Sequence, residues 1–224
     1  MSRLKMRFAL MAGTPMAGAS VALGQVVPAP GPEQVAKLIA VLKSDAPHKE
    51  KGDACRQLAV VGTEDAVPAL AALLADEKLS HMARYGLEPI PDASVDDALR
   101  DALGKLKGKP LVGVMASVGV RRDAKAVEAL SRFLEESDPH VVRTAARSLG
   151  KIATPEAAKA LKQRMASAPA PLRTFVADGC LTCAERLLTL GQKADAAAMF
   201  ESVERAELPE YIRLAAKQGA TLAR

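Results

Sequence analysis

The sequence repeats one apolar pattern about every 30 residues along most of its length. Each copy has an apolar residue, a second one three or four positions later, and a third four positions after that. This spacing places the three side chains on one stripe of a helix. The central positions are 38, 70, 99, 130, 161 and 199, so the steps are 32, 29, 31, 31 and 38 residues. The copies are Val35/Leu38/Leu42, Val67/Leu70/Leu74, Val95/Leu99/Leu103, Val127/Leu130/Leu134, Ala158/Leu161/Met165 and a weaker pair, Met199/Val203.

A second helical segment lies between successive copies. In DPHVVRTAARSLGKI (138–152), Asp138 is suited to the N-cap and Pro139 to the first helical position. The apolar face that follows is Val142, Ala145, Ala146 and Leu149, and DACRQLA (53–59) repeats its register. Each unit is therefore a helical hairpin, which cannot bury its apolar stripe alone. Residues 33–224 predict an all-α solenoid of about six stacked hairpins.

The segment DPHVVRTAARSLGKIATPEAAKAL resembles the short bacterial HEAT repeat, of the kind also found in phycobilisome lyases. TEDAVPALAALLADE is similar to the first helix of the same unit, and the resemblance covers roughly residues 33–168. CAERLLTLGQKADAAAMFESVERAEL is loosely similar to a tetratricopeptide hairpin, with Gly191 at its turn. The resemblance implies a fold and leaves function open, because HEAT repeats occur in scaffolds, adaptors, lyases and appendages of enzymes.

Three segments depart from the regular repeat. Pro89 and Pro91 in GLEPIPDAS predict a stiff, kinked connection between two units. KPLVGVMASVGV (109–120) is almost wholly apolar, and its β-branched residues suit a strand, but its position in the repeat favours a helix. PEYIRLAAKQGATLAR stops inside a second helix without a polar capping unit. We therefore expect the solenoid to be truncated, to continue beyond the C-terminus, or to end against a partner.

The first 24 residues have the pattern of an export signal. Three basic residues precede an apolar stretch from Phe8, and the small residues Ala22-Leu23-Gly24 follow. Residues 25–32 form a Pro-rich linker. These features predict a periplasmic or extracellular protein. No apolar run in the sequence reaches the roughly 18–20 residues of a membrane-spanning helix.

The formal net charge of +5 does not indicate nucleic-acid binding. Three of the 31 basic residues, Arg3, Lys5 and Arg7, lie in the predicted signal segment, which has no acidic residue. From residue 25 onward, 28 basic residues accompany 26 acidic ones. Aromatic residues that could stack on bases make up only 3% of the chain. We therefore expect no nucleic-acid partner.

The Cys-x-x-Cys pair in GCLTCAER (179–186) is predicted to be a packing feature. Ala184 stands where c-type haem attachment requires histidine. Cys180 falls more than two turns into a helix starting near Leu172, whereas a thioredoxin-type thiol lies at a helix start. Zinc would need two more ligands, and the remaining candidates lack ligand spacing: Cys55, His48, His81 and His140. Cys55 and Cys180 occupy buried positions of the repeat. One disulfide bond is the alternative if the protein is exported.

No catalytic constellation is evident in the sequence. His81 and His140 lie near helix starts without a nearby carboxylate or serine partner, which favours surface or capping roles. Phosphate-binding, metalloprotease, hydrolase and EF-hand motifs are missing. The carboxylates at 96, 97 and 101 lie near a helix start, where they suit the helix dipole. We predict a protein that is not an enzyme and uses neither cofactor nor metal.

Basic residues on the second helices form the candidate binding surface. Arg143 and Arg147 are spaced i, i+4, Arg213 and Lys217 repeat that spacing, and Arg56 matches Arg147 in register. In HEAT-like solenoids the second helices line the concave surface, so the resemblance implies a basic stripe there. A solvated face balanced by Glu and Asp is the alternative. The predicted stripe is Arg56, Arg84, Arg143, Arg147, Arg213 and Lys217, and a further group flanks the apolar helix at Lys105, Lys107, Lys109, Arg121 and Arg122.

Together these features predict a non-catalytic scaffold that binds a protein or peptide on its concave surface, where the basic stripe favours an acidic partner. The alternative is an accessory repeat region of a larger exported enzyme whose catalytic domain lies outside this chain. A lyase activity is a weaker option, against which export argues.

Overall fold

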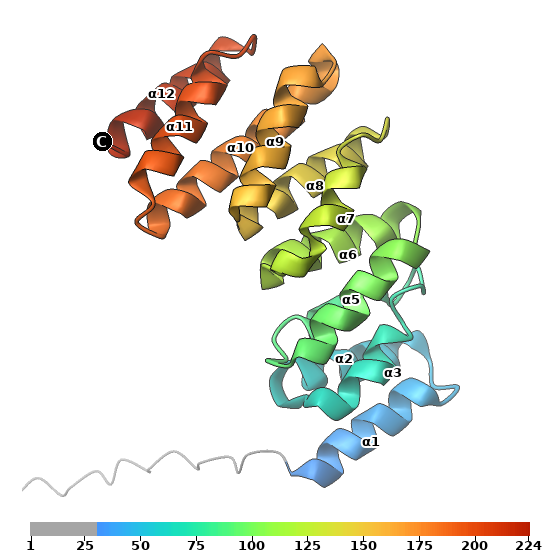
Figure 1. Ribbon diagram of the computed structural model, residues 1–224. Coiled ribbons are helices and arrows are strands. Elements are labelled where there is room, and N and C mark those ends of the chain that lie inside the picture. The colour runs from blue at the N-terminus through green and yellow to red at the C-terminus, as the bar shows by residue number, and fades with distance from the viewer. Residues whose placement is uncertain (1–30) are drawn as a thin grey trace, which may run out of the picture.

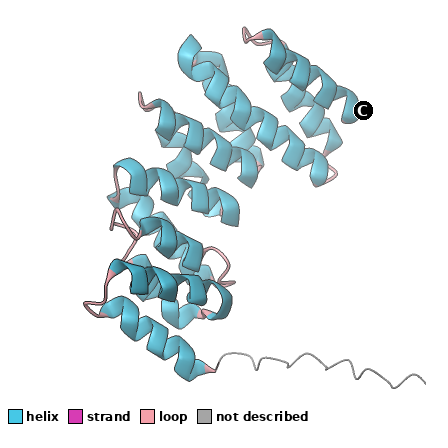
Figure 2. Ribbon diagram, turned by 180° about the vertical axis from the view of Figure 1, so that it is seen from behind, coloured by secondary structure: helices cyan, strands magenta, loops and turns pink. Residues whose placement is uncertain are grey.

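The computed structural model describes residues 31–224, which form six helical hairpins stacked in sequence order (Figure 1). Within this range the elements are helices joined by short loops, without strands (Figure 2). The predicted all-α solenoid is confirmed. The hairpins are α1 Pro32–Lys43 with α2 His48–Val61, α3 Val67–Ala71 with α4 Ser80–Leu87, α5 Ala93–Lys105 with α6 Gly108–Arg121, α7 Val127–Phe133 with α8 Pro139–Ile152, α9 Pro155–Ser167 with α10 Ala170–Thr189, and α11 Lys193–Glu204 with α12 Glu210–Leu222.

Short 3-10 turns, η1 Glu64–Ala66 and η2 Ala124–Ala126, precede α3 and α7. The predicted signal segment 1–24 and the linker as far as residue 30 lie outside the described residues. Helix α1 begins at Pro32, the last residue assigned to that linker.

Local signals in the sequence set the helix ends. The Asp138 carboxylate accepts a hydrogen bond from the His140 N–H at 2.8 Å, and Pro139 follows it in the first turn of α8, as predicted. Gly191, predicted at a turn, joins α10 to α11 with φ of +76°, which glycine adopts without strain.

The predicted apolar stripes form the core. Residues of the first helices, such as Leu70, Leu99, Leu130 and Leu161, are fully buried, and so is the apolar face predicted for α8. One position differs from the prediction. In α9 the buried residue is Ala157, whereas Ala158 is half-buried. The spacing 157, 161 and 165 repeats that of Val95/Leu99/Leu103 and directs this stripe towards the core.

The apolar segment 109–120 is helical, forming most of α6. A helix suits it because α6 is covered by α4, α5 and α8. Glycines allow the second helices to approach closely. A Cβ on Gly119 of α6 would lie 2.8 Å from Ser148 of α8, and one on Gly179 of α10 would lie 2.6 Å from the Ala146 carbonyl oxygen. Small residues thus bring neighbouring second helices into backbone contact.

The first helices are spread farther apart. An opening of about 590 Å³ lies between α7 and α9, and another of about 450 Å³ lies between α9 and α11. A stack that is tight on one side and open on the other curves towards its tight side. The second helices therefore line the inner side of the curve over the middle of the stack.

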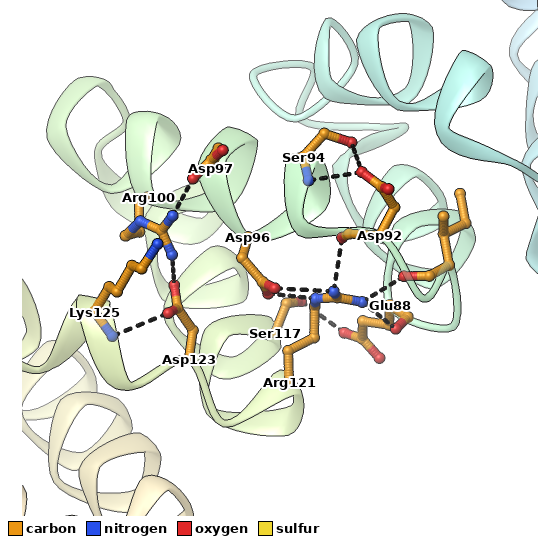
Figure 3. Close-up of polar contacts among 11 residues, drawn as sticks. Glu88, Asp92, Ser94, Asp96, Asp97, Arg100, Ser117, Arg121, Asp123 and Lys125 are labelled. Carbon is orange, nitrogen blue, oxygen red and sulfur yellow. Dashed lines mark hydrogen bonds and ion pairs between the residues drawn. The ribbon is translucent and has the colours of Figure 1, made fainter.

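Arg121 anchors the proline-containing connection between α4 and α5 (Figure 3). Pro89 and Pro91 have no N–H to donate, so nearby carbonyls lack helical partners. The Arg121 guanidinium donates to the carbonyl oxygens of Glu88, Ile90 and Asp92 at 2.8–3.1 Å. It also forms a two-point ion pair with Asp96, at 2.5 and 3.1 Å. Arg121 is only 12% exposed, so it fixes this connection instead of contributing to a basic surface.

Other carboxylates around α5 also pair locally, and Asp101 lies in the C-terminal half of this helix instead of near its start as predicted. Arg100 bridges Asp97 of its own helix and Asp123 beyond α6, and Lys105 pairs with Asp101 at 2.6 Å. Hydrogen bonds from Ser94 to the Asp92 carboxylate cap α5 and hold the pKa of Asp92 below its usual range (Figure 3). Asp92 and Asp96 therefore act at the junction of the second and third hairpins, whereas Asp97, Asp101 and Asp123 pair with basic residues of α5.

Candidate functional site

The six predicted cations do not form one continuous stripe. Arg56 lies exposed on α2, where it pairs with Asp53 one turn earlier. Arg143 and Arg147 are exposed neighbours on α8. On α12, Arg213 lies two positions after Tyr211, and Lys217 lies two positions after Ala215. Both Tyr211 and Ala215 line the groove described below. Two positions correspond to about 200° of rotation around a helix, so these two cations point away from α8.

Arg84 is a packing residue more than a surface cation. It is half-buried between α4 and α6, where a Cβ on Gly113 would lie 2.6 Å from its Cζ atom. Its Nη1 is 3.5 Å from the Ser117 hydroxyl, and its Nε is buried without a hydrogen-bond partner among the described residues. Burial lowers the pKa of Arg84, and the nearby Glu88 opposes this shift. Glycine at position 113 makes room for this guanidinium.

A groove of about 380 Å³ crosses three consecutive second helices near the C-terminal end of the stack. Helix α8 forms one wall, α10 the floor and α12 the other wall. The groove has two cations, one acid, two aromatic rings and several small or apolar groups. Its lining residues are Arg143 and Arg147 from α8, Thr174, Phe175, Asp178 and Leu181 from α10, and Tyr211, Ile212 and Ala215 from α12.

The two arginines of the groove have different environments. The Arg143 guanidinium lies over the ring of Phe175, with its Cζ 4.1 Å from the ring centroid. This cation–π contact holds the side chain in place, and Arg143 remains exposed. Within residues 31–224 no carboxylate lies in ion-pair distance of Arg143. Arg147 has one, because its Nε lies 3.4 Å from Oδ2 of Asp178, yet its side chain remains 58% exposed.

The aromatic and acidic residues of this groove were not among the predicted site residues. Phe175 lies 32 residues after Arg143, which is within one residue of the 31-residue step between these two units. The repeat therefore contained a signal that Phe175 adjoins Arg143 on the next second helix. Tyr211 carried no comparable signal, because the last step of the repeat is longer than the others.

Among the described residues, exposed large apolar side chains occur mainly on the second helices. Among the described residues they occur on the second helices, or directly after one, and none occurs on a first helix. Tyr211 is 72% exposed. The others are Val60 on α2, Tyr85 on α4, Val120 on α6, Leu190 at the end of α10, and Leu214 and Leu222 on α12.

The three cysteines are fully buried, free thiols, as expected for packing residues. Burial raises the pKa of Cys180 to about 12 and those of Cys55 and Cys183 to about 11. Such thiols stay protonated at neutral pH and are poor nucleophiles. In the described part of the chain, no cluster of three or more His, Cys, Asp or Glu side chains could hold a metal ion. No helix there is long and apolar enough to cross a membrane.

Comparison with known proteins supports the repeat assignment. Residues 111–178 match the family described as HEAT repeats, a range that runs from α6 into α10. A search of curated protein sequences finds no significant match.

Solved structures similar to this chain include an engineered protein, with 19% identity and a TM-score of 0.49, covering 84% of this chain and 96% of that one. The complex of CpcE and CpcF of phycocyanin lyase from Nostoc sp. PCC7120 has 21% identity and a TM-score of 0.44, over 83% of this chain and 73% of that one. Computationally designed armadillo repeat proteins for modular peptide recognition have 17% identity and a TM-score of 0.45, over 84% of this chain and 99% of that one.

Proposed function

We propose that this protein is a non-catalytic scaffold that binds a partner protein along the surface of its second helices. The distribution of exposed large apolar side chains carries this proposal, because in the described residues they avoid the first helices altogether. Exposed apolar surface is a feature of many interaction sites, and here it recurs along the second helices. A stacked solenoid presents such a surface already ordered, so binding costs little conformational entropy.

The partner is proposed to be a protein or peptide with acidic groups. Arg143 and Arg147 are exposed on this surface, and arginine forms two-point hydrogen bonds with carboxylates. A nucleic-acid partner is disfavoured by the near balance of charge after residue 25. The signal-like residues 1–24 support a role in the periplasm or outside the cell.

Affinity capture with matched variants tests the scaffold proposal. The immobilised protein is compared with the variant Tyr85→Ser/Val120→Ser, changed on second helices, and with Glu128→Ser/Arg132→Ser, changed on the first helix α7. Circular dichroism confirms that all three are folded. We expect wild type and the α7 variant to retain the same partner from the exported fraction of the native cells, and the second-helix variant to lose it. Equal retention by both variants would show that the second-helix surface is not the binding surface.

A further inference from the structure

The groove across α8, α10 and α12 combines two arginines on one wall with an aromatic ring on the other. We propose that it is a subsite for an extended peptide segment of the partner, with acidic residues at alternate positions and a large apolar residue between them. This proposal rests on the proposed function, and it names the chemistry that the scaffold recognises at one place.

The spacing of the arginines matches an extended chain. Arg143 and Arg147 are one helical turn apart, which is about 6 Å along α8. Alternate residues of an extended peptide are about 6.6 Å apart and point to the same side. Two acidic side chains separated by one residue therefore reach both guanidinium groups when the peptide runs along α8.

The intervening residue points the opposite way, towards α12. There Tyr211 and Ala215 form the wall, and Leu181 contributes to the floor. Tyr211 is 72% exposed and so has most of its ring area still to bury. A phenylalanine or leucine at this position would cover the ring, and aromatic residues of this kind contribute much of the affinity at protein interfaces.

Phe175 is the positioning residue of the subsite. The Arg143 Cζ lies over its ring at 4.1 Å from the centroid, and a guanidinium stacked on a ring can still donate hydrogen bonds to a carboxylate in its own plane. In that arrangement the ring contact and carboxylate binding do not compete. Asp178 is the acid that lines the groove, and it holds Arg147 from the Nε side. It opposes an incoming carboxylate, which makes Arg143 the stronger of the two anchors.

Nuclear magnetic resonance titration of the ¹⁵N-labelled protein tests the subsite with three blocked pentapeptides. The first is acetyl-Ser-Glu-Phe-Glu-Ser-amide, which has the alternating pattern. The second replaces both glutamates by glutamine. The third, acetyl-Ser-Glu-Glu-Phe-Ser-amide, has the same composition as the first with adjacent acids. We expect the first peptide to shift signals of α8, α10 and α12 and to bind about tenfold more tightly than the glutamine peptide, as expected for loss of a charge-assisted hydrogen bond.

Protein variants separate charge recognition from packing. Arg143→Gln and Phe175→Leu should each weaken the alternating peptide severalfold and leave the glutamine peptide unchanged, whereas Asp178→Asn should strengthen it. Arg132→Gln on the outer helix α7 is the control and should have no effect. Equal binding of the glutamine peptide, equal binding of the rearranged peptide, or no saturable shift in the groove would each overturn the subsite. The scaffold proposal would then still be decided by the capture experiment, which changes residues outside this groove.

Discussion

Arg121→Met should lower the free energy of unfolding by about 3 kcal/mol. The substitution keeps much of the apolar stem of the side chain and removes five hydrogen bonds, two to Asp96 and three to the carbonyls of the proline connection. Removing one member of a buried ion pair typically costs about 3–5 kcal/mol, because the remaining charge stays buried and unpaired. The Asp96 side chain is 26% exposed and so regains some hydration, which places the expected loss near the lower end.

Thermal and urea unfolding monitored by circular dichroism measure this loss. For a chain of this size, about 3 kcal/mol corresponds to a decrease in Tm of roughly 6–12 °C. Arg121→Lys keeps the charge and loses the two-point geometry, so its Tm should lie between those of wild type and Arg121→Met. The matched control is Arg132→Met, which removes an arginine that is 77% exposed and should change stability by less than about 0.5 kcal/mol. If Arg121→Met unfolds at the same temperature as this control, Arg121 does not anchor the connection.

Three further changes test the packing. Gly179→Ala should lower the free energy of unfolding by about 1–3 kcal/mol, because its Cβ would meet the Ala146 backbone. Gly104→Ala, in open space on α5, should raise it by up to about 1 kcal/mol. Equal Tm values for the two variants would contradict the close approach of α8 and α10. Asp138→Ala should cost about 1 kcal/mol by removing the α8 cap, and an unchanged urea midpoint would argue against it. Burial raises the pKa of Cys180 from 9.0 to about 12, so the unfolded chain loses this proton at a lower pH than the folded chain. Stability should therefore fall as pH rises from about 9 to 12, and thiol labelling at mildly alkaline pH should require denaturant; rapid labelling of the folded protein would contradict this burial.

Local sequence patterns predicted most of the architecture. The apolar period, the Asp138–Pro139 helix start and the Gly191 turn each depend on residues close together in the chain, and the structure has them where they were expected. The register of α9 was misplaced by one residue, because Ala157 and Ala158 both fit an apolar stripe. Only packing against the core distinguishes the two.

The roles of individual cations were less predictable. Arg121 and Arg143 are both arginines of second helices and look alike in sequence. The first contacts a proline-containing connection about 30 residues earlier, and the second lies on Phe175 in the next repeat. Arg213 and Lys217 have the same spacing as Arg143 and Arg147 but lie on another side of their helix. A repeat pattern defines which side of each helix is buried, and it leaves undefined what the remaining sides face.

The sequence by itself determined that this chain builds a stack of helical hairpins, because helix period, caps and turns are local properties. The tertiary structure decided which polar side chains join the stack and which stay available to a partner. That outcome depends on how each helix is rotated against its neighbours, and on the close approaches that Gly119 and Gly179 permit. The groove of Arg143, Phe175 and Tyr211 follows from this packing, since its residues come from three helices that only stacking brings together.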